Sequence, residues 1–279
     1  MTSRRHAVWL LAPGLVAVLL LFYLPQALMF VVSLGSRSPY GMVVPGIGLA
    51  NYARALDPLY LWILWRSLLL ALATTVVCLA VGYPVAWWIG RVAPAKYRTA
   101  LLTFVILPFW TSFLVRMYAW IVLLRSEGVV NHALVAIGVP RLPLLYNDFA
   151  VLVGQVYGEL PFMIIPLYVS IEKLDAVLLE AAADCGAGPL RTFRSIVIPQ
   201  TLPGIVAGCV LVFIPSLGAY LAPDLLGGGK TAYIGNLIQS QFAVARDIPF
   251  GAALSFVLSV VVLALLVVFR RPLKSAQTL

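Results

Sequence analysis

The chain has 279 residues, of which 62% are hydrophobic and only 10% are charged, and its formal net charge is +9. Soluble domains usually carry about 25% charged residues, so this chain has too few polar side chains to coat a water-facing surface. The basic residues sit at the ends of apolar segments instead of clustering on one polar face, which argues against nucleic-acid binding. The composition predicts an all-α, polytopic membrane protein.

Six apolar segments are long enough to cross a bilayer, and each should be helical because lipid offers the backbone no hydrogen-bond partner. In chain order they cover residues 10–32, 64–89, 101–124, 150–170, 204–221 and 252–269. The first segment exceeds the apolar core of a signal peptide, about 7–15 residues, and is interpreted as a retained span. We expect an N-terminal part over 1–63 (tail, first span and outer loop) and a core transmembrane domain over 64–279.

The charges that flank these segments predict the orientation. One set of ends carries eleven basic residues: Arg4, Arg5, Arg91, Lys96, Arg98, Lys173, Arg191, Arg194, Arg270, Arg271 and Lys274. The other set carries seven: Arg37, Arg54, Arg66, Arg125, Arg141, Lys230 and Arg246. Because cytoplasmic loops carry the excess of Lys and Arg, both termini are predicted to be cytoplasmic, and the loops 33–63 and 125–149 to face outward. The bias alone leaves the inverted topology open.

The loop after the fourth segment, residues 172–205, is too polar to span a bilayer. It is compatible with a helix as far as Cys185, with one apolar stripe and one charged stripe. The apolar stripe holds Leu174, Leu178, Ala181, Ala182 and Cys185, and the charged stripe holds Lys173, Glu180 and Asp184. Gly186 and Gly188 break this helix, and Pro189 opens a second one, predicted to end by Pro199. Two short helices that meet at a glycine corner suit a groove on a partner protein or the membrane surface, and both readings stay open.

The same loop resembles the EAA loop of ABC-importer permeases. Glu180-Ala181-Ala182 is followed by three residues, Gly186, nine residues and Ile196-x-Ile198-Pro199, whereas the family pattern is EAA-x3-G-x9-I-x-L-P. The departure is Ile198 in place of Leu. In that family the loop, here 171–202, forms coupling helices that dock into the ATPase subunits. The resemblance therefore implies an ATPase-coupling role for a set of residues: Glu180, Ala181, Ala182, Gly186, Ile196 and Pro199.

Three more segments extend the resemblance: 108–120 (PFWTSFLVRMYAW), 214–229 (IPSLGAYLAPDLLGGG) and 234–242 (IGNLIQSQF). They are similar to the first-permease subunit of spermidine/putrescine importers. The resemblance implies a type I ABC-importer permease in the bacterial inner membrane. It also implies a second permease subunit in a heterodimer, two cytoplasmic ATPase subunits and an extracytoplasmic solute-binding protein. ATP and Mg are expected on the ATPase subunits, with no cofactor and no enzyme activity on this chain. Related permeases import opines, thiamine or ferric iron, so these substrates stay as alternatives, with a secondary transporter as a distant one.

Two ionisable residues fall inside predicted spans, Arg116 in the third and Glu159 in the fourth. Such groups are costly in a membrane and are functional candidates by default. They form either a structural pair or part of a transport path, and the sequence leaves both open. A polyamine path needs carboxylates and aromatic faces for ammonium groups, which adds further candidates: Trp110, Tyr118, Tyr220 and Asp224. Trp and Tyr also form interfacial belts, so the aromatic candidates have a plain alternative.

Other chemistries find little support. The histidines, His6 and His132, and the three cysteines lack metal-ligand spacing, so no metal site is expected. The stretch Gly227-Gly228-Gly229-Lys230-Thr231 resembles the end of a phosphate-binding loop, but Asp224 occupies the position of its first glycine. This stretch is interpreted as an outer turn. No internal repeat supports an inverted-repeat transporter.

Overall fold

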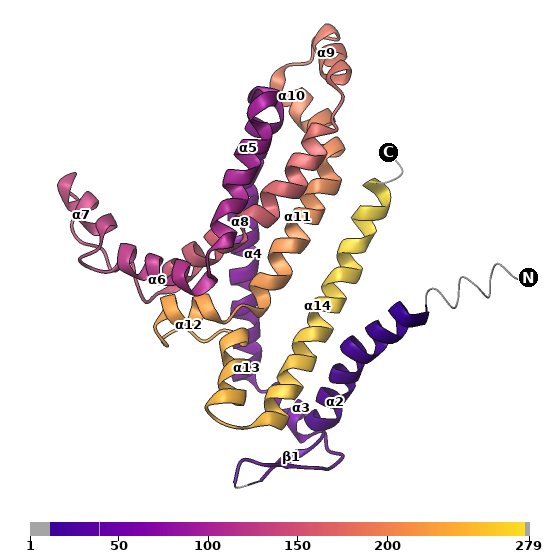
Figure 1. Ribbon diagram of the computed structural model, residues 1–279, viewed down its shortest axis with the longest axis vertical. Coiled ribbons are helices and arrows are strands. Elements are labelled where there is room, and N and C mark those ends of the chain that lie inside the picture. The colour runs from indigo at the N-terminus through magenta and orange to yellow at the C-terminus, as the bar shows by residue number, and fades with distance from the viewer. Residues whose placement is uncertain (1–11, 39, 277–279) are drawn as a thin grey trace, which may run out of the picture. The chain divides into compact units, whose positions relative to one another are not determined.

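The computed structural model describes residues 12–38 and 40–276, with side chains described as far as Val267. Arg4, Arg5 and His6, and the side chains of Arg270, Arg271 and Lys274, lie outside the described part. Most of the described chain is helical (Figure 1), which confirms the predicted all-α class. It forms two compact units. Unit 1 holds the described residues of Met1–Trp62 and Leu237–Val261, and unit 2 those of Ile63–Asn236 and Val262–Leu279.

Unit 1 begins with a helix over Ala12–Ser33 and includes a small antiparallel hairpin, in which Ser36 pairs with Val44 and Arg37 with Val43. Its elements are η1 (Leu19–Tyr23, π-helical), α2 (Leu24–Ser33), β1 (Ser36–Arg37), β2 (Val43–Val44), α3 (Ala50–Ala55), most of α13 (Ile234–Ala243) and the first half of α14 (Ile248–Ala276). An ion pair links α3 to the start of α14, with 2.9 Å between Arg54 Nη1 and Asp247 Oδ2. The guanidinium also stacks on the Phe250 ring.

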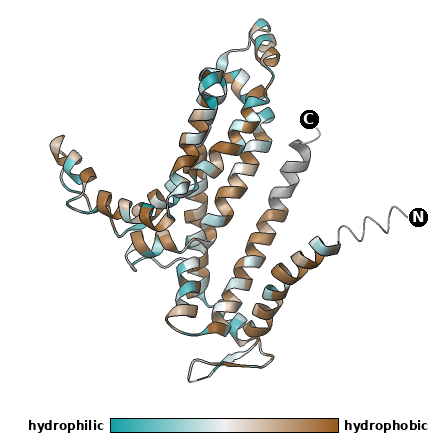
Figure 2. Cartoon of the chain, viewed as in Figure 1, coloured by the Kyte–Doolittle hydropathy of each residue, from teal (hydrophilic) through white to brown (hydrophobic). Residues whose placement is uncertain are grey.

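Unit 2 holds the remaining helices. They are α4 (Pro58–Trp87), η2 (Trp88–Val92, π-helical), α5 (Ala95–Ile106), η3 (Leu107–Trp110, 3-10), α6 (Phe113–Leu124), α7 (Val129–Ala136), α8 (Asp148–Glu172), α9 (Ala176–Asp184), α10 (Pro189–Thr192), η4 (Phe193–Val197, π-helical), α11 (Ile198–Gly218) and α12 (Leu221–Gly227). Figure 2 shows apolar residues along α4, α8 and α11, whereas polar residues gather at the loop that contains α9.

Among the described residues, five helices are long and apolar enough to cross a membrane, or six if one bent pair counts as a span. The five are Ala12–Ser33, Pro58–Val92, Asp148–Glu172, Pro189–Gly218 and Ile248–Val267. They overlap the first, second, fourth, fifth and sixth predicted segments. The multi-pass prediction is therefore confirmed.

The predicted third span, 101–124, is wrong as a continuous helix. Helices Ala95–Trp110 and Phe113–Ala136 meet at an angle of 91°. Pro108 lies at the start of a 3-10 turn, and Thr111 and Ser112 then have extended backbone with ψ of 149° and 138°. The apolar run continues through this break, so hydropathy alone cannot detect it.

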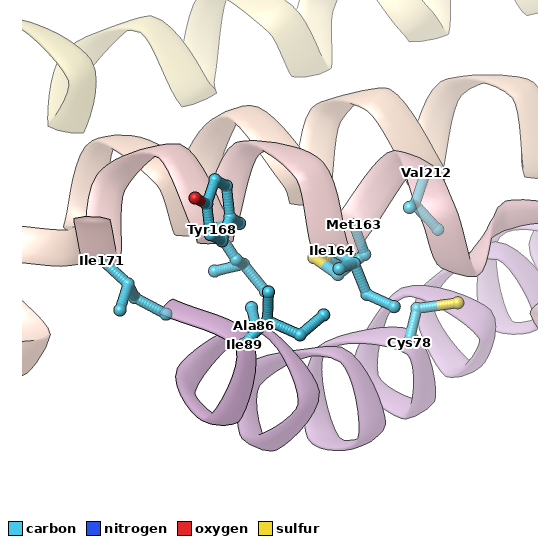
Figure 3. Close-up of a cluster of buried hydrophobic side chains, with 9 residues drawn as sticks. Cys78, Ala86, Ile89, Met163, Ile164, Tyr168, Ile171 and Val212 are labelled. Carbon is cyan, nitrogen blue, oxygen red and sulfur yellow. The ribbon is translucent and has the colours of Figure 1, made fainter. Parts of the chain in front are cut away.

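The core of unit 2 lies where α8 packs against α4 and α11 (Figure 3). The buried residues are Cys78, Ala86, Ile89, Met163, Ile164, Leu167, Tyr168, Ile171 and Val212. Glycines let α11 approach α8 closely: a Cβ at Gly208 would lie 2.7 Å from Met163 Sδ. Small residues at helix contacts are typical of membrane bundles, where packing rather than the hydrophobic effect holds helices together.

Polar bonds across the helices strengthen this core. Thr74 on α4 donates to Gln155 Oε1 on α8 over 3.0 Å, and Gln155 Nε2 in turn donates to the carbonyl of Ser216 on α11 over 3.5 Å. Side-chain hydrogen bonds of this kind between membrane helices contribute about 0.6–2 kcal/mol each. These bonds fix the register of α4, α8 and α11 relative to one another.

Candidate functional site

The loop after α8 folds into the compact corner that its sequence predicts. The chain leaves α8 at Glu172 and begins α9 at Ala176. Asp175 is the N-cap of α9, and its Oδ1 accepts a hydrogen bond from the Val177 N–H over 2.9 Å. A capping carboxylate satisfies one of the free N–H groups of the first turn. This cap fixes where the first short helix starts.

Gly186 ends α9 in a left-handed conformation, with φ of +74°. The Ala187 N–H donates to the carbonyl of Ala182 and the Gly186 N–H to that of Ala183, both over 2.9 Å. This pair of bonds is the Schellman motif, which needs a residue with positive φ just past the helix. The spacing between the EAA residues and the glycine is thus the spacing of a helix C-cap, and the predicted glycine corner is present.

The second helix does not end by Pro199, as the sequence suggested. Pro189 begins a helix that continues through α10, η4 and α11 as far as Gly218. The η4 turn is π-helical, with the Ile198 N–H donating to the carbonyl of Phe193. A wider turn immediately before a proline relieves the clash and the lost donor that would otherwise break the helix. The corner is therefore continuous with a membrane-spanning helix.

Much of the corner is open to a partner. Glu180 and Ala181 are exposed, whereas Ala182 is buried. Two large apolar side chains face outward, Val177 at 63% and Leu190 at 61% exposed. Of the later motif residues, Ile196 is half-buried and Pro199 is exposed. Apolar side chains displayed beside charged ones are typical of a docking surface.

The base of the corner is tied to α4 and η2. The Arg91 guanidinium donates a hydrogen bond to the carbonyl of Leu174, a buried residue between α8 and α9. The Tyr83 ring packs edge-to-face on Phe193, with centroids 5.7 Å apart, and its hydroxyl lies 3.0 Å from Thr201 Oγ1. These anchors join residues about 80–120 positions apart, and no local pattern in the sequence indicates them.

The second candidate site surrounds Arg116 on α6. Its side chain is buried, and the guanidinium faces three aromatic rings, at 4.7 Å from the Phe109 centroid, 5.4 Å from Phe113 and 5.9 Å from Tyr157. Phe109 also packs edge-to-face on Phe162. A cation over aromatic faces gains about 0.5–2 kcal/mol. These contacts stabilise the guanidinium charge, which would be energetically costly in contact with lipid alone.

Arg116 and Glu159, for which the sequence left a structural pair and a path role open, form no ion pair among the described side chains. Ion pairs among the described side chains join Arg54 to Asp247, Arg66 to Asp148 and Arg141 to Glu127. Two nitrogens of Arg116 and one carboxylate oxygen of Glu159 are buried without a hydrogen-bond partner. Both residues therefore keep polar atoms without a partner inside the helix bundle, and the path role stays a prediction.

The other tentative path residues lie at more open positions. Trp110 is 79% exposed and Tyr118 57% exposed, and Tyr220 and Asp224 are exposed as well. Among the described residues, no ion pair or cation–π contact joins them to Arg116 or Glu159, so their part in a path stays a prediction. Phe109 and Phe113, which were not singled out from the sequence, make the contacts to Arg116 instead.

At the other end of α4 and α8 a polar cluster holds the two helices together. Arg66 Nη2 lies 2.7 Å from both carboxylate oxygens of Asp148, and the Tyr233 hydroxyl donates to Asp148 over 2.8 Å. Burial, with this hydrogen bond, raises the pKa of Tyr233. The Ile234 N–H donates to Ser67 Oγ over 2.8 Å. Polar bonds therefore join α4 and α8 at the end of these helices that is remote from the corner.

Comparison with known proteins identifies relatives along nearly the whole chain. Residues 82–271 match the family described as "Binding-protein-dependent transport system inner membrane component". The chain is 45% identical over 256 residues to the spermidine/putrescine transport system permease protein PotB of Escherichia coli (strain K12), covering 91% of this chain and 93% of PotB. The Haemophilus influenzae PotB is 42% identical, covering 89% of this chain and 87% of that protein.

A solved structure shares the fold at low sequence identity. It is the crystal structure of a bacterial ABC transporter involved in the import of the acidic polysaccharide alginate, with a TM-score of 0.73 and 20% identity. The alignment covers 99% of this chain and 98% of that one. The match confirms the predicted type I permease fold.

Proposed function

The chain belongs to the family of binding-protein-dependent transport system inner membrane components, and from this premise we propose that it imports a polyamine, spermidine or putrescine, as one permease of an ATP-driven importer. The observation that carries the substrate class is the 45% identity, over 91% of the chain, to a permease named for spermidine and putrescine. The fold does not select the substrate, because a structure with the same fold comes from an importer of an acidic polysaccharide.

The intramembrane site supports a cationic substrate. Glu159 offers a buried carboxylate oxygen that has no partner, and an ammonium group is the natural partner for such an oxygen. The cation of Arg116 would repel a polycation, but the rings of Phe109, Phe113 and Tyr157 surround it. We infer that Glu159 lines the path, and that Arg116 positions the aromatic residues beside it.

The coupling corner supports the partners. Exposed Glu180, Val177 and Leu190 form a surface for an ATPase subunit, which holds ATP and Mg and carries out the hydrolysis. Because the helix from Pro189 continues to Gly218, a push on α10 is transmitted directly to α11 and, through its close contact with α8, to the span that carries Glu159. A second permease as heterodimer partner and an extracytoplasmic binding protein complete the importer.

The decisive experiment measures uptake in proteoliposomes that contain the complete importer and its binding protein. Radiolabelled spermidine and putrescine should accumulate only with ATP, and vanadate should abolish uptake while a proton gradient has no effect. Opines, thiamine and ferric iron should not compete. If one of these solutes is taken up instead and no polyamine accumulates, the substrate assignment is wrong, whereas the ATP-driven importer assignment stands. Uptake driven by a proton gradient would refute the ATP-driven class.

Cys185 provides a native probe for orientation and docking. It is exposed beside Gly186, whereas Cys78 is buried and Cys209 half-buried. In the proposed topology the corner is cytoplasmic, so an impermeant maleimide should label Cys185 in inside-out vesicles and not in whole cells, and bound ATPase should protect it. Cysteines introduced in the 33–63 loop should show the opposite sidedness. Reversed labelling of both sites would overturn the orientation.

A further inference from the structure

An apolar groove lies at the corner where the α4–η2 helix turns into α5. It has a volume of about 340 Å³ and an apolar lining. Its walls include Trp88, Ala93, Pro94, Tyr97, Leu101 and Phe104. All of these residues belong to unit 2, so the shape of the groove depends on one compact body.

Three aromatic side chains of this groove are strongly exposed: Phe104 at 69%, Tyr97 at 52% and Trp88 at 49%. In a chain that crosses the membrane, such rings contact lipid or another chain. Trp and Tyr at the end of a span are typical of the level of the lipid headgroups, and Phe104 lies two helical turns from Tyr97, toward the apolar part of α5. The groove thus runs from the headgroup level into the hydrocarbon.

Three cations gather at its polar end. The Lys96 ammonium lies 4.7 Å from the Tyr97 ring centroid, and Arg98 Nε donates to the carbonyl of Ala93 over 3.3 Å. Arg91 keeps a buried Nε without a hydrogen-bond partner, although its Nη2 donates to Leu174. Among the side chains that the structure describes, none of the three forms an ion pair. The sequence contains no Asp or Glu between Asp57 and Glu127, so no acidic neighbour in sequence offsets their charge.

We propose that this groove binds an anionic phospholipid of the membrane. An acyl chain lies on Trp88, Tyr97 and Phe104, and the phosphate headgroup contacts Lys96 and Arg98. Charge complementarity selects this occupant: a zwitterionic lipid fills the apolar groove equally well but leaves the cations uncompensated. Basic clusters at the ends of membrane helices recognise anionic headgroups in this manner.

The site lies next to the coupling corner. Arg91, the third cation, holds the carbonyl of Leu174 at the base of α9. A bound phosphate near Arg91 would therefore help to fix the hinge between α8 and α9. In this way the lipid would influence how efficiently ATP hydrolysis is coupled to transport. Lipid binding itself does not depend on which solute the importer carries.

The test uses the assembled importer in nanodiscs of phosphatidylcholine that contain one-fifth photoreactive phosphatidylglycerol, with the diazirine on the acyl chain. Crosslinked peptides should map to residues 88–104. Each Lys or Arg near an anionic surface contributes about a fivefold preference, so the double variant K96Q/R98Q should reduce labelling of this segment by at least about fivefold. Labelling by photoreactive phosphatidylcholine should be weaker and unaffected by the variant.

The control variant R125Q/K230Q removes two exposed cations elsewhere and should leave labelling unchanged. Co-purification of the ATPase with each variant confirms that assembly is intact. Equal labelling by the two lipids, or labelling that K96Q/R98Q does not change, would overturn the proposal. Absence of any label on 88–104 would do the same and would indicate that a protein chain covers the groove.

Discussion

The corner formed by residues 175–189 and the Arg116 cluster both belong to unit 2, but different forces determine their geometry. The corner rests on local backbone chemistry: a cap at Asp175, a Schellman motif at Gly186 and a proline-initiated helix at Pro189. The Arg116 cluster rests on rings brought together from α6, η3 and α8. The corner is formed by residues within about 15 positions of one another, whereas the Arg116 cluster forms only when distant helices pack together.

This difference explains which expectations succeeded. A motif with fixed spacing encodes a conformation when each of its residues has a backbone role, as Gly186 does with its positive φ. Two charges in neighbouring spans, such as Arg116 and Glu159, have no comparable backbone signal, so the sequence left both a structural pair and a path role open for them. Arg116 is buried and Glu159 half-buried, and both lie in unit 2, yet each keeps buried polar atoms without a partner. The predictions below test this contrast, starting with the largest expected effect.

Gly186→Val should cause the largest loss. A β-branched residue at φ of +74° costs about 1–3 kcal/mol, and the corner would reorient to avoid that strain. Polyamine uptake by reconstituted importer should fall more than about tenfold, with the permease still present in the membrane and less ATPase co-purifying with it. Normal uptake with normal ATPase binding would show that the corner is not the coupling element.

Gly186→Asn is the matched control. Asn tolerates the left-handed region far better than Val, and a Cβ at this position has nothing within 4 Å. Asn should therefore retain most of the uptake. Equal loss in both variants would mean that the glycine is needed for close contact with the ATPase rather than for its backbone conformation.

Glu159→Gln should follow, with a roughly tenfold reduction in uptake. The change keeps the size of the side chain and removes the charge, and a hydrogen bond to a charged group contributes about 1.5–3 kcal/mol. The polyamine concentration that gives half-maximal uptake should rise, whereas basal ATP hydrolysis and assembly should stay normal. Glu127→Gln is the control, because Glu127 is exposed and pairs with Arg141 over 3.5 Å, an interaction of little energetic weight. Unchanged uptake in Glu159→Gln would give Glu159 a structural role.

Much of the fold follows from the sequence because lipid forces every apolar segment into a helix. Five of the six predicted segments overlap continuous helices. The two wrong predictions, a continuous third span and a short helix that ends by Pro199, share a cause. Whether a helix ends at a proline depends on the local backbone geometry, which hydropathy does not report. Pro108 precedes a sharp bend at Thr111, whereas a π-helical turn carries the chain past Pro199. The anchors of the corner, Arg91 and Tyr83, depend on contacts across the bundle and could not be predicted from neighbours in sequence.

Arg116→Met should separate stability from transport. Replacing a buried charge by an apolar side chain of similar length is often neutral or stabilising, because the cost of removing the charge from water is avoided. The lost cation–π contacts offset this by about 0.5–2 kcal/mol. The melting temperature of the purified permease should therefore change little, and uptake should fall several-fold. A large drop in melting temperature would show that the guanidinium is mainly a structural element of the aromatic cluster.

Asp175→Ala should have the smallest effect, and it tests whether the corner depends on its parts separately. Loss of an N-cap typically costs about 1 kcal/mol, here through the bond from the Val177 N–H to Asp175 Oδ1. The Schellman motif at Gly186 and the Arg91 anchor at Leu174 remain, so α9 should fray at its first turn without changing direction. We expect uptake to fall about fivefold or less, and Asp175→Asn, which caps as well, to restore it. Hydrogen exchange should rise at the first turn of α9 and stay constant around Gly186. If exchange instead rises across the whole corner, the cap and the glycine act as one cooperative unit, and the local reading of this motif is wrong.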